Sequence, residues 1–202
     1  MSELFSIQLQ NRQQQGRDGV WLDLPTTTEQ VQAALRQIGI SSDNPQGLFI
    51  SGYFAEEKKR FAIPYNMVLA SNVDELNFLA SRLETLSTGE RAELNAALQA
   101  PQSELFSIGR ITDFPENVDY YVHLPDVHGP AQLGDYYLNR SGMVDMPEEW
   151  KGGIDTAQFG RYVAQQEQGV FTEYGYIVKS GDAWQKVHEG QPVPEEYRVL
   201  SF

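Results

Sequence analysis

The chain has 202 residues, with 28 acidic and 15 basic side chains and no cysteine. The lack of cysteine excludes disulfides, thiolate metal sites and a thiol nucleophile, and a chain of this length buries enough surface to fold without them. A hydrophobic fraction of 41% excludes a disordered acidic tail. The apolar runs are too short for a transmembrane helix, and the first residues do not resemble an export signal. We therefore expect a globular cytoplasmic protein.

Residues 1–65 predict a small α+β domain. Apolar side chains at alternate positions over residues 5–9 indicate a strand, and residues 20–24 and 48–54 indicate two more. Between the second and third strands, apolar residues recur at helical spacing over residues 31–38. The order of this domain is therefore strand, strand, helix, strand.

Residues 66–101 predict a helical domain. Apolar residues with helical spacing run over residues 73–86 and again over 94–98, and Pro101 ends the second helix. Helix starts are indicated by pairs with the spacing of a capping box. These pairs are Thr26 with Glu29, Ser71 with Asp74, and Ser87 with Glu90.

Residues 102–202 predict a second α+β domain. Short strands are expected at 106–108, 170–179 and 184–187, with an interruption at Gly175, and residues 197–202 have the pattern of an edge strand. Helices are expected over 133–140, ended by Gly142, and after Asp155, ended by Gly169.

The net charge of −13 is concentrated in the middle of the chain. Residues 61–150 hold 14 acids and 4 bases, whereas residues 1–60 have a net charge of −1 and residues 151–202 of −2. The helix dipole explains acids in first turns, such as Asp74, Glu75 and Glu90. The remaining excess would repel phosphate, so direct binding of nucleic acid is not expected.

A metal site is an unfavoured interpretation of the histidines. His123 and His128 lie five residues apart with Asp126 between them, but a zinc site needs three or four ligands in tetrahedral geometry. Loop histidines bonded to the backbone are the preferred interpretation, and neither a metal nor another cofactor is expected.

A magnesium-dependent nuclease is a further unfavoured alternative. Pro125-Asp126 followed by Glu149-Trp-Lys151 spells a PD…ExK pattern, in which two carboxylates hold the metal and the lysine orients the attacking water. That chemistry requires adjoining strands, whereas residues 146–153 predict a helical turn ended by glycines. A stacking platform at Tyr136-Tyr137 is also unfavoured, because no basic groove accompanies it.

Five stretches in register resemble the ArdA antirestriction family, and they span roughly residues 15–180. They are Gly19-Val-Trp-Leu-Asp-Leu-Pro25, Asp74-Glu-Leu-Asn-Phe-Leu-Ala80, Leu133-Gly-Asp-Tyr-Tyr137, Ile154-Asp-Thr-Ala-Gln-Phe-Gly-Arg-Tyr-Val163 and Thr172-Glu-Tyr-Gly-Tyr-Ile177.

This resemblance implies a non-enzymatic inhibitor. ArdA proteins are small acidic dimers carried by mobile genetic elements, and each subunit is an elongated α+β chain of three small domains. Their carboxylates imitate the phosphates of bent B-form DNA and occupy the DNA groove of type I restriction–modification enzymes. The resemblance therefore implies a restriction–modification enzyme as the protein partner, a homodimer with its contact in residues 102–202, and no membrane partner.

The resemblance implies a DNA-mimic surface built from carboxylates of the acidic middle segment. The residues assigned to it are Asp74, Glu75, Glu84, Glu90, Glu93, Glu104, Asp113, Glu116, Asp119, Asp126, Asp135, Asp145, Glu148 and Glu149. The acidic motif of the family is diluted here, because Asn139 and Arg140 interrupt the stretch 133–150. An acidic interaction module that binds another basic, DNA-binding protein remains the alternative function.

Overall fold

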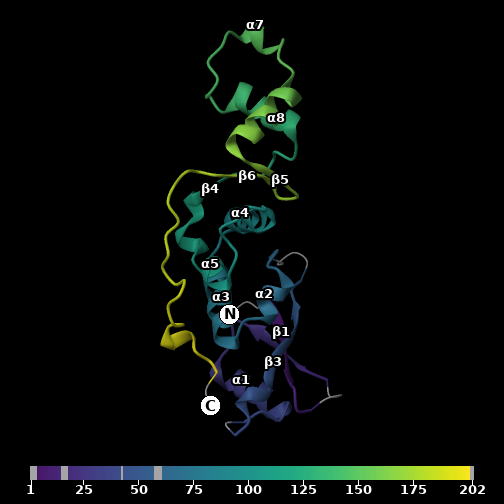
Figure 1. Cartoon of the computed structure of the whole chain (residues 1–202), viewed down its shortest axis with the longest axis vertical. Helices are drawn as coiled ribbons and strands as arrows, with labels where there is room; N and C mark the ends of the chain where they lie inside the picture. Colours follow the sequence, from purple (N-terminus) through teal and green to yellow (C-terminus); the bar gives the residue numbers. More distant parts are fainter. Residues whose placement is uncertain (1–3, 15–17, 42, 57–60, 201–202) are drawn as a thin grey trace. The chain divides into compact units, whose positions relative to one another are not determined.

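A computed structural model describes residues 4–14, 18–41, 43–56 and 61–200 (Figure 1). They form two compact units: unit 1 comprises the residues up to Ser87, Glu104–Glu116 and the residues from Gln185, and unit 2 comprises Thr88–Ser103 and Asn117–Trp184. Helices and a small antiparallel sheet occur in each unit, which confirms the α+β class. The division into three domains at residues 65 and 101 stays a prediction.

The sheet of unit 1 is antiparallel with the order β2-β1-β3. Its strands are β1 (Phe5–Asn11), β2 (Val20–Leu24) and β3 (Leu48–Phe54), which confirms the three strands predicted from alternation. Every second side chain of β1 is buried, because successive side chains of a strand point to opposite faces. A single helical turn, η1 (Pro45–Gly47), leads into β3.

Helix α1 (Thr28–Gln37) covers the buried face of this sheet with Val31, Ala34 and Leu35. Its capping box joins Thr27 and Gln30, so the predicted pair Thr26–Glu29 is wrong by one residue. The reason is tertiary: Thr26 is buried, and its backbone N–H donates to Asn77 Oδ1 at 2.7 Å. This bond holds Thr26 against α3 and delays the start of the helix.

Helices α2 (Tyr65–Leu69) and α3 (Val73–Glu84) follow in unit 1. The cap of α3 is Asn72 with Glu75, again one residue after the predicted pair, because the Ser71 hydroxyl donates to the Met67 carbonyl at 2.9 Å and so belongs to the end of α2. The apolar stripe of α3, which includes Leu76, Leu79 and Leu83, is fully buried.

The predicted strand at 106–108 is wrong. Ser107 instead accepts a hydrogen bond from the backbone N–H of Arg110 at 3.3 Å and caps α5 (Ile108–Thr112), which packs on α3 and is followed by the short turn η3 (Phe114–Glu116). A serine hydroxyl satisfies a helix N-terminus directly, and this preference outweighs the apolar flanks that suggested a strand.

The residues from 185 to 200 return to unit 1 in irregular conformation, with one turn, η6 (Glu195–Tyr197). The predicted strand at 184–187 is therefore wrong, as is the described part of the one at 197–202; residues 201–202 lie outside the described residues. Aromatic contacts hold the segment, since the Phe78 ring lies 4.9 Å from His188 and 4.7 Å from Tyr197.

Unit 2 has an antiparallel sheet with the order β4-β6-β5, formed by β4 (Tyr121–Leu124), β5 (Val170–Thr172) and β6 (Gly175–Lys179). Helix α4 (Thr88–Gln99) packs against β4 and β6, and the turn η4 (Val118–Tyr120) precedes β4. Gly175, with a φ of +116°, reverses the chain between β5 and β6, at the predicted interruption.

The remaining helices of unit 2 are α6 (Pro130–Asp135), the π-helical turn η5 (Tyr136–Arg140), α7 (Glu148–Lys151) and α8 (Thr156–Glu167). Asp155 caps α8 as predicted, by accepting from the N–H groups of Ala157 and Gln158. Gln168, rather than Gly169, takes the left-handed conformation at its end, with a φ of 58°.

Two glycines allow α6 and α8 to touch along their backbones. A Cβ atom on Gly160 would lie 1.9 Å from the Pro130 carbonyl oxygen, and one on Gly134 would lie 1.9 Å from that of Thr156. Real Cβ atoms do not approach carbonyl oxygens so closely, so any larger residue at either position must separate the two helices.

Gly160→Ala is therefore expected to destabilise the protein, although alanine is the better helix former by about 1 kcal/mol. The free energy of unfolding, measured with urea, should fall by about 1–3 kcal/mol because of overpacking. Gly152→Ala is the matched control, since nothing lies within 4 Å of its Cβ position. Equal stability of the two variants would show that the close helix contact is not required.

Candidate partner-binding surface

The fourteen predicted carboxylates differ in exposure. Five are exposed, eight are partly buried, and Asp113 is fully buried. All five exposed ones belong to unit 2, and they are Asp119, Asp126, Asp145, Glu148 and Glu149. Unit 2 as a whole holds 12 acids and 5 bases, a net charge of −7.

Asp113 was expected on the surface, and the structure corrects this. Its two carboxylate oxygens accept the backbone N–H groups of His188 at 2.6 Å and Glu189 at 3.2 Å. A buried carboxylate satisfied in this way holds the chain in place and cannot present its charge to a partner.

The acids at the start of α3 also have structural partners. One oxygen of Asp74 accepts the N–H groups of Val199 and Leu200, both at 2.8 Å, and Glu75 completes the capping box with Asn72. Both acids also lie where the helix dipole favours negative charge. Removing either would weaken the fold of unit 1, so neither is suited to a test of partner binding.

Four of the predicted carboxylates, including the exposed Glu148, form ion pairs. Asp135 accepts from Arg140 at 2.8 Å, and a hydrogen bond from Asn139 together with this one lowers the pKa of Asp135. Glu148 pairs with Lys151 at 2.6 Å. In unit 1, Glu116 pairs with Arg82, and Glu104 pairs with Arg110 at 2.7 Å.

Of these cations, Arg110 forms ion pairs with two carboxylates. It is 8% exposed, and its Nε also donates to Glu189 Oε1 at 3.0 Å, which lowers the pKa of Glu189. Its guanidinium lies 4.5 Å from the centre of the Phe106 ring. One buried arginine therefore balances two acids that lie far apart in the sequence.

Among the predicted surface residues, Glu93 has a carboxyl group whose pKa is strongly raised. Burial, together with the neighbouring charges of Glu90 and Asp119, raises its pKa to about 8. Its Oε1 is buried without a hydrogen-bond partner among the described residues. Most Glu93 side chains are thus protonated near pH 7, and Glu93 adds little charge there. The remaining two residues are also partly buried: Glu84 is the last residue of α3, and Glu90 lies in the first turn of α4.

Sequence reasoning omitted several exposed acids of unit 2, namely Asp155, Glu173 and Asp182. They follow residue 150, where the densest acidic segment of the sequence ends. A search for acidic segments along the chain therefore leaves them out. The compact unit, rather than the sequence segment, groups them together.

The alternatives with a metal ion gain no support. Within the described ranges, no group of three or more His, Asp or Glu side chains could hold a metal ion. Lys151, the lysine of the PD…ExK pattern, lies in the helical turn α7 and pairs with Glu148. His123 Nε2 lies 2.7 Å from the Tyr174 carbonyl, as expected for a histidine bonded to the backbone, although it belongs to β4 rather than a loop.

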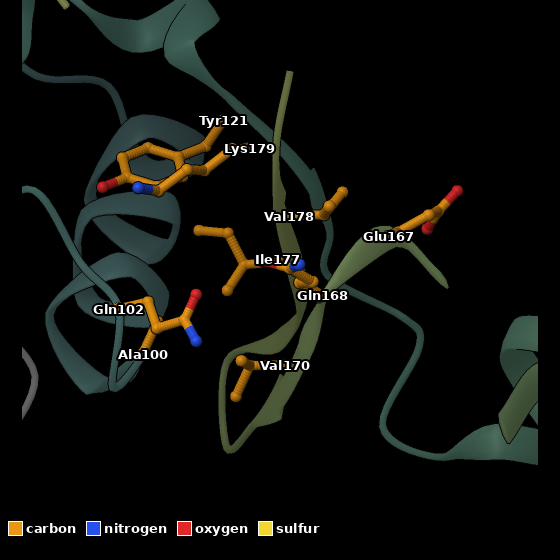
Figure 2. A pocket seen from close by; sticks show the side chains of 9 residues that line it. All are labelled: Ala100, Gln102, Tyr121, Glu167, Gln168, Val170, Ile177, Val178 and Lys179. Atoms are coloured by element: carbon orange, nitrogen blue, oxygen red, sulfur yellow. The ribbon is translucent and has the colours of Figure 1, made fainter. Parts of the chain in front are cut away.

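Unit 2 also contains a small cavity of about 110 Å³ between the end of α4 and the sheet (Figure 2). In the view of Figure 2, Ile177 lies between Gln102 on one side and Tyr121 and Lys179 on the other, while Glu167 points away. Glu167 accepts the hydroxyls of Tyr137 at 2.5 Å and Tyr176 at 3.0 Å. The volume of this cavity is below the 300–1,000 Å³ typical of small-molecule sites, so this cavity is not a candidate small-molecule site.

Glu93→Gln is expected to reduce the pH dependence of stability. A carboxyl with a raised folded-state pKa favours the folded state when protonated, so the free energy of unfolding should fall as pH rises from about 4.5 to 8. Between pH 5 and 9, the free energy of unfolding of the variant should rise relative to that of the parent by on the order of 1–2 kcal/mol. The difference is limited to this size because solvent screens a partly exposed group. Urea unfolding at several pH values measures this, and an unchanged slope would contradict the assignment.

No helix among the described residues is long and apolar enough to cross a membrane. Comparison with curated proteins finds no match. A family profile described as antirestriction protein (ArdA) matches residues 15–178, which is most of the chain. The acidic chain described above therefore belongs to the ArdA antirestriction family.

Proposed function

We propose that this protein inhibits a type I restriction–modification enzyme by occupying its DNA groove with surface carboxylates in place of DNA phosphates. Family membership supports an antirestriction function, and the observation that carries the finer proposal is the set of exposed carboxylates on unit 2. The protein acts in the cytoplasm, by binding alone, and makes or breaks no covalent bond.

The size of the charge is compatible with mimicry. Duplex DNA carries one charge per ~1.7 Å of axis, so two chains with a net charge of −13 each match roughly 44 Å of duplex. Lys and Arg side chains that bind phosphate also bind carboxylates, and complementary charge accelerates association. Binding should therefore weaken steeply with increasing salt concentration.

A homodimer is part of the proposal, with the contact on unit 2. Three large apolar side chains between residues 143 and 162 are exposed: Met143 at 73%, Trp150 at 66% and Tyr162 at 60%. Exposed aromatic residues and methionine are enriched at protein interfaces. They account for the contact better than the carboxylates, which repel one another.

Neutralising the exposed carboxylates of unit 2 should abolish inhibition while the fold is retained. In the quadruple variant Asp119→Asn, Asp126→Asn, Asp145→Asn and Glu149→Gln, each position is exposed, so stability should change by less than about 1 kcal/mol. Displacement of a labelled duplex from a type I enzyme, measured at two salt concentrations, should fall more than about tenfold.

The matched control removes the same charge from unit 1 through Asp43→Asn, Glu56→Gln, Glu195→Gln and Glu196→Gln, all at exposed positions. If both variants lose inhibition equally, the loss results from the change in net charge rather than from the surface of unit 2. Full inhibition by the unit 2 variant would exclude mimicry by these residues. Inhibition of another basic protein, but not of restriction, would favour the acidic interaction module.

Met143→Ser with Trp150→Ser should weaken the dimer at least about tenfold, because each removes exposed apolar area from the proposed contact. Sedimentation equilibrium measures the dissociation constant. Phe54→Ser, at a side chain 58% exposed in unit 1, is the control and should leave it unchanged. A monomeric parent protein would refute the homodimer.

A further inference from the structure

The sheet of unit 1 has two edge strands, β3 and β2. Helix α2 covers β3, and the Tyr65 hydroxyl of α2 donates to the Ser51 carbonyl at 3.1 Å. At the other edge, β2 pairs with β1 and with no other described strand. An uncovered edge strand offers unpaired N–H and C=O groups to any extended chain that can approach it.

The register identifies the unpaired groups. The Leu24 carbonyl accepts from the Leu4 N–H at 2.9 Å, so Leu24 directs its backbone groups toward β1. Because backbone groups alternate along an antiparallel strand, Leu22 does the same. The N–H and C=O groups of Trp21 and Asp23 therefore face away from β1, toward the open edge.

A groove of about 240 Å³ runs beside this edge, between β2 and α1. Trp21 and Asp23 line it from the strand, and Gln30, Ala33 and Gln37 are among the residues that line it from the helix. These helix side chains are uncharged, and Ala33 leaves room for a side chain of an added strand.

The charge of the groove selects the kind of chain that fits. Asp23 is the charged residue among those that line it, and residues 18–37 hold three acids and one base. Trp21 is 49% exposed, and its ring lies against Phe54, with the ring centroids 6.5 Å apart. An extended segment with a lysine or arginine satisfies the outward backbone groups and the Asp23 carboxylate together.

We propose that β2 and α1 form a binding site for an extended, basic peptide segment of a partner protein, which adds to the sheet as a fourth strand beside β2. This interaction surface belongs to unit 1 and does not depend on DNA mimicry by unit 2. A second copy of this chain paired edge to edge is the competing occupant.

The test begins with the full chain and a phage-displayed library of random ten-residue peptides. Selected peptides should contain lysine or arginine among residues of high strand propensity, and titration calorimetry gives their dissociation constants. Bound peptide should slow hydrogen exchange of the Trp21 and Asp23 amides in the parent protein. Failure to select any peptide, or selection without this protection, overturns the proposal.

A matched pair of variants isolates the backbone contribution. Trp21→Ala and Trp21→Pro both remove the indole, but the proline also removes the outward N–H, which an edge strand tolerates because that group makes no ladder bond. Trp21→Pro should bind the selected peptide about tenfold more weakly than Trp21→Ala. Asp23→Asn should weaken binding up to about fivefold, with loss of the preference for basic residues.

Thermal unfolding checks that each variant folds. If Trp21→Pro does not fold, hydrogen exchange measured on the parent protein with bound peptide tests the proposal instead. Equal binding by the alanine and proline variants would exclude strand addition. A change in sedimentation with Trp21→Pro in the absence of peptide would identify a second copy as the occupant and overturn the peptide site.

Discussion

Mutual repulsion among the carboxylates limits where this fold can place its 28 acidic side chains. The acids outnumber the bases by 13, and a compact chain brings them close together. Three local solutions recur. Asp74, Asp113 and Asp155 accept backbone N–H groups, Glu104 and Glu116 pair with arginines, and Glu93 keeps its proton near neutral pH. The carboxylates that remain exposed and charged are those available to a partner.

The same chemistry secures the C-terminal segment. Residues beyond 178 lie outside the family match, yet Asp74 and Asp113 hold the segment from 188 to 200 through four backbone N–H groups. Arg110 adds an ion pair to Glu189. These residues are part of unit 1 rather than an appendage, and two acids that sequence reasoning assigned to a partner stabilise the fold instead.

Local patterns predicted the regular elements well, and the errors have identifiable causes. Alternation and helical spacing predicted β1 to β3, α1 and α3, because each element buries one face on its own. Both tested capping boxes were placed one residue early, because Asn77 holds Thr26 and the end of α2 holds Ser71. The strand predicted at 106–108 failed because Ser107 caps a helix whose partner, α3, is distant in sequence.

The α+β class, the acidic excess and the family follow from the sequence alone, since composition, periodicity and short motifs are properties of neighbouring residues. Which carboxylates are free to act depends on the folded structure. Exposure, protonation and pairing depend on residues far apart along the chain, such as Asp113 with His188, Arg82 with Glu116, and Glu93 with Asp119. The open edge of β2 is likewise a consequence of strand order, because each strand pattern alone is compatible with a central or an edge position.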